Sequence, residues 1–141
     1  MPIVLLNQQE KTNLMFNIVL GLLGSISLLV GGIGIMNIMY LSVTERRYEI
    51  GILMAVGAPK DLILGQFLTE SSIIGLLGGL TGIVAGLLLT YAISAFFHIE
   101  TYITGQSVAV AFLVAFSISL FFGYFPARKA SLKSPSENLR M

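Results

Sequence analysis

The sequence has little charge and no cysteine. Only 11% of its 141 residues are charged, and the formal net charge is +1. The absence of cysteine excludes disulfides, thiolate metal sites and cysteine nucleophiles. The near-neutral charge, without a stretch of clustered basic and aromatic residues, argues against nucleic acid as a partner. The rest is strongly apolar: 55% of the residues are hydrophobic and the mean hydropathy is +0.89, too much for one small water-soluble core.

Three long runs contain no charged side chain: residues 14–43, 71–97 and 101–127. A helix rises ~1.5 Å per residue and the hydrocarbon layer of a bilayer is ~30 Å thick, so about twenty residues are enough to cross it. Each run meets that length. The sequence therefore predicts an all-α integral membrane protein with three transmembrane helices: residues 14–43, a longer helix over 59–97 that contains the second span, and residues 107–126.

The basic residues predict the orientation of these spans. Lys11 precedes the first span, whereas all the others lie between the first two spans or after the third. By the positive-inside rule, the N-terminus and the loop 98–106 lie outside, and the segment 44–58 and the tail 127–141 lie in the cytoplasm. No signal peptide is recognised before the first span, which is expected to act as its own insertion signal. The predicted cytoplasmic basic residues are Arg46, Arg47, Lys60, Arg128, Lys129, Lys133 and Arg140.

The first span is longer than a bilayer needs. The run over 14–43 amounts to ~45 Å of helix, and the polar residues 7–13 lead into it without a glycine or proline break. Two interpretations of residues 1–13 stay open. They form either a helical stalk that projects beyond the outer surface or a disordered tail ahead of an ordinary tilted span.

The cytoplasmic segment 44–58 contains an apolar stretch, residues 50–58, that is too short to cross a membrane. Such a stretch has to be covered, either by lying in the membrane interface or by docking into another protein. Docking is favoured because Gly51 and Ala55 share one helical face, which permits close backbone approach. Gly57 is expected to end this short helix in the left-handed conformation, and Pro59 is expected to open the next one.

Glycines of the second span repeat at an interval of four residues, in two rows. In lipid, small residues on one helical face allow close helix packing. The glycines within 31–34 are a candidate surface on the first span against which these rows would pack. The alternative is that glycine is simply frequent in membrane helices. The glycines assigned to helix packing are Gly31, Gly75, Gly78, Gly79, Gly82 and Gly86.

Catalytic constellations are missing. There is no G-x-x-x-x-G-K-[ST] loop, and the one histidine, His98, has no second histidine with which to share a metal. The one aspartate, Asp61, is predicted on the opposite side of the membrane from His98. We therefore expect no enzyme, and no catalytic, cofactor or metal site. His98 and Glu100 are expected to cap a helix or to be solvated, with a proton relay as the alternative, and Glu70 is either a solvated charge or a carboxylate facing a partner helix.

Several short motifs follow one another in order along the chain. They are GGIGIMNIM at 31–39, SVTER at 42–46, EIGI at 49–52, AVGA at 55–58 and QFL at 66–68 with Glu70, and then Gly123, PARKA at 126–130, Pro135 and LR at 139–140. Together they cover almost the whole chain. In this order they resemble the FtsX-like permease family of ABC transporters, and most of all the C-terminal membrane part of its macrolide exporters.

The resemblance implies a role for each part. Residues 1–141 would form a single FtsX-like permease domain in a bacterial inner membrane, working as a homodimer. Residues 45–56 would be a coupling helix seated on an ABC ATPase subunit or domain, which would bind ATP and magnesium. Closure of the ATPases would move the stalk by mechanotransmission and expel macrolide, peptide or lipoprotein-like substrates. The residues implied in the ATPase contact are Glu45, Arg46, Glu49, Ile50, Gly51 and Gly57.

Complete members of that family would also carry a first span and a periplasmic domain, so both are expected as parts missing from this sequence. The substrate stays open, as does the question of whether Met1 is the native start. An alternative of another class also stays open: a non-transporting membrane adaptor or truncated remnant, which inserts and dimerises without coupling to ATP hydrolysis.

Overall fold

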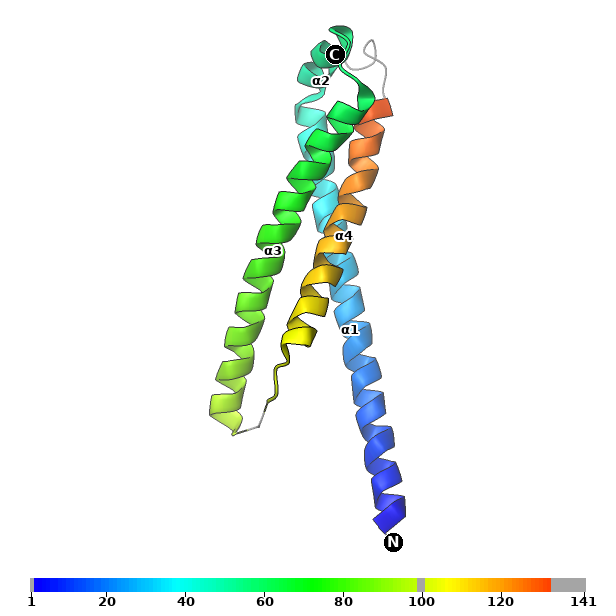
Figure 1. Cartoon of the computed structure of the whole chain (residues 1–141). Coiled ribbons are helices and arrows are strands. Elements are labelled where there is room, and N and C mark those ends of the chain that lie inside the picture. Colours follow the sequence, from blue (N-terminus) through cyan, green and yellow to red (C-terminus); the bar gives the residue numbers. More distant parts are fainter. Residues whose placement is uncertain (1, 99–100, 133–141) are drawn as a thin grey trace. The chain divides into compact units, whose positions relative to one another are not determined.

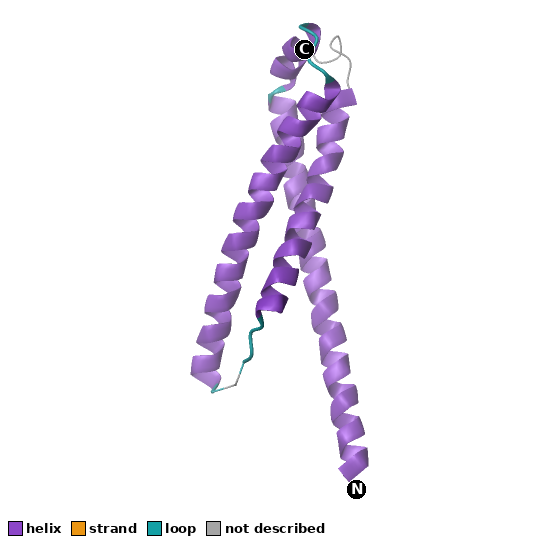
Figure 2. Cartoon of the chain, in the orientation of Figure 1, coloured by secondary structure: helices purple, strands orange, loops and turns teal. Residues whose placement is uncertain are grey.

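The computed structural model describes residues 2–98 and 101–132, which form four helices (Figure 1). They are α1 (Pro2–Glu45), α2 (Arg47–Ala55), α3 (Lys60–Phe97) and α4 (Gly105–Leu132). Loops join the helices, and the described residues contain no strand (Figure 2). Three of the helices are long and apolar enough to cross a membrane: α1 from Val4 onward, α3 and α4. The prediction of an all-α membrane protein with three spans is confirmed.

Some predictions concern residues outside the described ranges. They are the capping role of Glu100 and the tail beyond Leu132, with its basic and motif residues. His98 lies at the edge of a described range and is the residue that ends α3. It adopts the left-handed conformation with φ 52°, so its backbone forms the C-cap of that helix.

The chain divides into two units, residues 1–31 and residues 32–141. The first contains the N-terminal part of α1, which begins at Pro2, a residue suited to a first helical turn because it has no N–H to satisfy. Hydroxyl groups in this unit donate to carbonyls one turn back, Thr12 to Gln8 at 2.9 Å and Ser25 to Gly21 at 2.8 Å. Both hydroxyl groups are therefore satisfied within the helix, which for Ser25 also meets the requirement of the apolar run in which it lies.

In the second unit, α3 and α4 run antiparallel and pack through small residues (Figure 1). Ser71 of α3 lies against Gly123 of α4, and Ser119 of α4 lies against Gly75 of α3, because a Cβ atom added at either glycine would collide with the serine opposite. Both serines are buried, and the Ser119 hydroxyl donates to the Ser71 carbonyl at 2.8 Å. Each helix thus supplies one small-x-x-x-small motif, the arrangement that lets membrane helices approach closely.

The predicted glycine rows are used in part. Gly75 is followed by Gly79, where an added Cβ atom would lie 3.0 Å from the ring of Phe112 on α4. The surface that answers these glycines is on α4 rather than on the first span, where Gly32 instead meets the ring of Phe122. The reason is that α4 carries its own small residues at the matching interval. Glycines with no atom of the described chain within 4 Å of an added Cβ include Gly31, Gly34, Gly78, Gly82 and Gly86.

The core of the second unit lies at the end where α2 joins the long helices. All four helices contribute buried apolar residues to it. Elsewhere on the long helices the large apolar side chains are mostly exposed, which suits surfaces that face lipid. The core residues are Met39, Val43, Ile50, Ile63, Phe67, Ala127 and Ala130, with Ile35, Met54, Leu64 and Ile74 packed against them.

Candidate functional site

The start of α2 is a bend rather than a break in the chain. Arg46 adopts φ −96° and ψ 13°, which turns the backbone out of the direction of α1. Hydrogen bonds of helical spacing nevertheless continue through the bend, from the Arg46 N–H to the Ser42 carbonyl at 3.1 Å and from the Ile50 N–H to the Arg46 carbonyl at 3.0 Å. The backbone of α2 is therefore hydrogen-bonded to the last turn of α1 across the bend.

The end of α2 is fixed by a glycine turn. Gly57 adopts φ 97°, the left-handed region predicted for it. Its N–H bonds to the Met54 carbonyl at 3.1 Å, and the Ala58 N–H bonds to the Leu53 carbonyl at 2.9 Å. These two bonds form a Schellman motif, which satisfies carbonyls that the helix end would leave without partners. Pro59 follows as the N-cap of α3, in an extended conformation.

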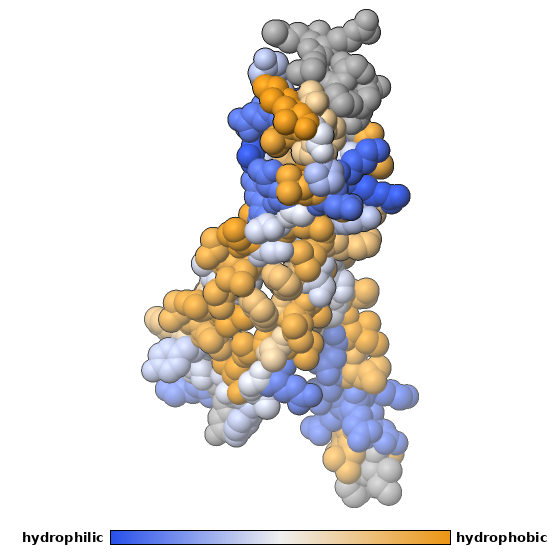
Figure 3. All heavy atoms as spheres, turned by 45° about the horizontal axis from the view of Figure 1, so that its top comes forward, coloured by the Kyte–Doolittle hydropathy of each residue, from blue (hydrophilic) through white to orange (hydrophobic). Residues whose placement is uncertain are grey.

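α2 has a buried face and an exposed apolar face. Ile50, 5% exposed, and Gly51 are buried against the long helices. On the other face, Tyr48, Ile52, Leu53 and Val56 are 63%, 44%, 40% and 84% exposed. We call these four residues the α2 apolar patch. At this end of the second unit, Figure 3 shows apolar atoms gathered beyond a band of hydrophilic residues.

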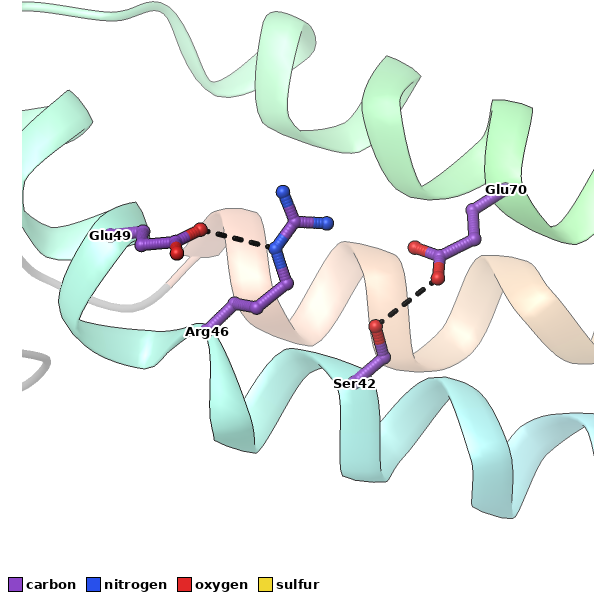
Figure 4. Close-up of polar contacts among 4 residues, drawn as sticks. All are labelled: Ser42, Arg46, Glu49 and Glu70. Atoms are coloured by element: carbon purple, nitrogen blue, oxygen red, sulfur yellow. Dashed lines mark hydrogen bonds and ion pairs between the residues drawn. The ribbon is translucent and has the colours of Figure 1, made fainter.

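The structure divides the six residues implied in ATPase contact into different positions. Glu45 and Glu49 are exposed, and the Arg46 Nε donates to Glu49 Oε2 at 3.2 Å in an ion pair on the surface (Figure 4). Gly57 is exposed in its turn. Ile50 and Gly51, by contrast, lie inside the chain's own core. Because they are buried, Ile50 and Gly51 hold α2 in place. The residues available for contact with a partner are the exposed residues of the same helix.

A second polar contact ties α1 to α3. The Ser42 hydroxyl donates to Glu70 Oε1 at 3.3 Å, and both residues are half-buried (Figure 4). Of the two interpretations of Glu70, the structure supports the carboxylate that faces a neighbouring helix of the same chain. The last turns of α1 thus continue along the chain into α2. They also contact α3 through this hydrogen bond and through the shared core.

Metal-ligating side chains are not gathered together in the described part of the chain. No three histidine, aspartate or glutamate residues among the described residues are grouped so as to hold a metal ion. The arrangement is a short helix with an exposed apolar face, joined to α1 through the bend at Arg46 and to the core through Ile50.

Two features of the site escaped the sequence analysis. One is the role of α4, whose Ser119 and Gly123 repeat the Ser71 and Gly75 interval of α3. The four-residue spacing of serine and glycine in both runs was the available signal. The other is the Ser42–Glu70 hydrogen bond, which joins residues far apart in the sequence and had no local signal at all.

Comparison with known proteins identifies the family. A family model described as FtsX-like permease C-terminal matches residues 21–135, most of the chain. The chain belongs to the FtsX-like permease family. The resemblance inferred from the ordered motifs is therefore confirmed, and this FtsX-like permease domain has the three membrane-length helices of an integral membrane protein.

Relatives of this FtsX-like permease domain carry the name "Macrolide export ATP-binding/permease protein MacB". The Azoarcus protein is 52% identical over 118 residues, which are 84% of this chain and 18% of that protein. The Pasteurella multocida protein is 45% identical over 131 residues (92% and 20%), and the Rhodospirillum rubrum protein is 47% identical over 131 residues (93% and 20%). The chain thus spans about a fifth of the length of these relatives.

Proposed function

We propose that the chain is the membrane-embedded C-terminal portion of an ABC transporter permease, and that it transmits ATPase-driven motion across the inner membrane. The observation that carries this proposal is the two-faced α2. Its α2 apolar patch is uncovered, whereas Ile50 and Gly51 fasten the opposite face to the long helices. An exposed apolar patch rimmed by charges is typical of a protein interaction site.

The proposed route of transmission starts at α2. Force applied to the α2 apolar patch reaches the core through Ile50 and reaches α1 through the continuous hydrogen bonds at the Arg46 bend. The Ser42–Glu70 hydrogen bond and the core carry it on to α3. Packed helices are stiff, so a displacement at this end moves each helix as a body rather than compressing it. This is mechanotransmission without a path for substrate through the chain.

The partner that fits the patch is an ABC ATPase subunit or domain, which would hold ATP and magnesium. The relatives' names contain the words "ATP-binding/permease", which supports such a partner. We further propose export of macrolide, peptide or lipoprotein-like substrates, a homodimer, an N-terminus outside the inner membrane with residues 2–13 as part of a stalk, and a cytoplasmic C-terminus. Gly78 and Gly82, where no atom of the described residues lies within 4 Å of an added Cβ atom, are available for contact with a second copy.

The test is site-specific crosslinking in intact cells. A photoreactive amino acid replaces Leu53 in the α2 apolar patch, and we expect its major protein product to be a polypeptide with a P-loop ATPase sequence. Mass spectrometry of the crosslinked band identifies that polypeptide.

The matched control is the same amino acid in place of Leu132. That leucine is 59% exposed and ends α4 at the same end of the second unit, but it lies outside the α2 apolar patch. We expect little ATPase product from position 132. Products at position 53 that contain lipid alone would refute the coupling role and would favour the non-transporting membrane adaptor.

A further inference from the structure

One buried side-chain donor atom in the second unit has no hydrogen-bond partner among the described residues. The Nε atom of Arg47 is buried and has no hydrogen-bond acceptor among the described residues. A guanidinium group has only N–H donors and no acceptor, so each of its buried N–H groups needs an acceptor nearby. Leaving a charged donor buried without an acceptor is costly, because it loses water and gains nothing in return. An acceptor from outside the described chain is therefore expected at Arg47.

Arg47 lines a small hollow between α4 and the junction of α1 with α2. Tyr40, Thr44, Pro126 and Lys129 also line it, and its volume is about 10 Å³. That volume has room for one oxygen-sized atom and not for a larger group. An acceptor that enters is thus a single oxygen, whose parent group stays at the mouth beside Lys129. We call this feature the basic hollow.

No carboxylate among the described residues forms a salt bridge with Arg47. Glu49 pairs with Arg46, and Glu70 accepts from Ser42. The ion pair of Arg46 with Glu49 is the one salt bridge found among the described residues. The basic hollow thus has two cations, Arg47 and Lys129, and no anion of its own in that part of the chain.

The basic hollow lies at the level expected for lipid head groups. Tyr40 is 45% exposed and stands near the end of the first apolar run, and Lys129 follows the end of the third. The Lys129 Nζ lies 5.3 Å from the centre of the Tyr40 ring, a cation–π contact that keeps the ammonium beside the hollow. Tyrosine and lysine at the ends of apolar runs are typical of the membrane–water interface. The α2 apolar patch consists of other residues, so its partner does not have to cover the basic hollow.

We propose that the basic hollow binds the phosphate group of an anionic membrane phospholipid, with one phosphate oxygen accepting a hydrogen bond from Arg47 Nε and Lys129 facing the remaining charge. Phosphate oxygens form strong charge-assisted hydrogen bonds with guanidinium donors. Basic pockets between helices on the cytoplasmic side of a membrane are suited to anionic head groups. A zwitterionic lipid offers the same phosphate, but its own ammonium offsets the charge that Lys129 would meet.

The test is native mass spectrometry of the full chain released from lipid nanodiscs. The nanodiscs contain phosphatidylethanolamine with either phosphatidylglycerol or cardiolipin, and a parallel sample in detergent receives inorganic phosphate alone. We expect one anionic phospholipid to stay bound to the wild-type chain. Arg47→Gln should lower its retention about tenfold, the effect of losing one hydrogen bond to a charged group. Lys129→Gln should lower it about fivefold, as expected for one surface cation.

Matched controls lie next to each residue. Arg46→Gln and Arg128→Gln remove the same charge from exposed or half-exposed neighbours that do not line the basic hollow, and each should leave lipid retention within about twofold of wild type. Lys129 is exposed, so Lys129→Gln tests the site even if Arg47→Gln disturbs the fold.

Three results would overturn the proposal. One is equal retention of phosphatidylethanolamine and the anionic lipids, and another is an equal loss in the control variants. The third is binding of inorganic phosphate without selective retention of lipid, or of no phosphate at all, which would leave a water molecule as the acceptor for Arg47.

Discussion

Two neighbouring arginines at the start of α2 are both half-exposed but differ in their partners. The Arg46 side chain is 40% exposed and pairs with Glu49, which is itself 66% exposed. An ion pair so open to solvent contributes about 0–1 kcal/mol. Arg47 has a buried Nε without an acceptor in the described chain, so its energetics depend on what enters the basic hollow. The two residues are identical and adjacent in the sequence. Their side chains have different partners because successive residues of a helix point in different directions.

Small residues decide whether α3 and α4 can touch. At Gly75, an added Cβ atom would lie 2.6 Å from the Ser119 Cβ, closer than two side chains can stand. We predict that Gly75→Val lowers the free energy of unfolding by ~1–3 kcal/mol, the usual cost of overpacking. The measurement is unfolding by SDS in mixed micelles, followed by circular dichroism.

Gly82→Val is the control for this prediction. No atom of the described chain lies within 4 Å of a Cβ atom added at Gly82. The change in stability should stay below about 0.5 kcal/mol, as for a surface substitution. If Gly82 faces a second copy, as proposed, this variant should weaken self-association instead. Equal destabilisation by both variants would contradict the assignment of Gly75 to the α3–α4 contact.

At the scale of the element, α2 depends on both of its ends. The bend at Arg46 keeps it bonded to α1, and the Schellman motif at Gly57 turns the chain into α3. Between them, Ile50 and Gly51 hold one face on the core. A nine-residue helix has little stability of its own, so these attachments, rather than helix propensity, keep it folded.

The turn at Gly57 predicts that a glycine-to-alanine substitution has opposite effects on stability at Gly57 and at Gly65. Gly57→Ala places a side chain at φ 97°, and we expect a loss of about 1–2 kcal/mol of stability, since L-residues are strained in left-handed conformations. Gly65→Ala introduces the same methyl group in the helical part of α3 where nothing lies within 4 Å, and should instead gain up to about 1 kcal/mol. SDS titration of both variants measures the difference. A stabilising Gly57→Ala would show that this turn does not require glycine.

At the scale of the whole molecule, the lack of cysteine makes the orientation directly testable. Single cysteines at Asp61 and Thr101 lie in exposed positions, one in the first turn of α3 and one in the connection between α3 and α4. We predict that a membrane-impermeant maleimide labels Thr101→Cys in intact cells and labels Asp61→Cys only after the inner membrane is opened. The reverse pattern would invert the proposed topology and place α2 away from any cytoplasmic ATPase.

Much of the architecture was predictable because lipid imposes simple rules. An uncharged run such as 71–97 has to be helical in a bilayer, since its backbone groups find no other partners there. The glycine turn at Gly57 was predictable because its conformation depends on local chemistry alone. The helix that answers Gly75 was not predictable, because Ser119 and the first-span glycines have similar local patterns, and only three-dimensional packing selects between them.

The candidate site was predicted as a segment but not residue by residue. Composition identified 50–58 as an apolar stretch that has to be shielded from water. It could not show which of these residues are buried within the chain itself and which are left exposed. Ile50 and Gly51 turn inward because the bend at Arg46 sets the rotation of α2, and Leu53 and Val56 turn outward for the same reason.

The sequence by itself determined three membrane-length helices, a short helix between the first two, and membership of a permease family, because the length of an apolar run and the order of motifs are one-dimensional properties. Only the tertiary structure decided that Ser71 meets Gly123, that Ser42 donates to Glu70, and that Arg47 Nε has no acceptor among the described residues. These outcomes depend on the rotation of each helix about its axis, which packing fixes and which no single run of residues contains.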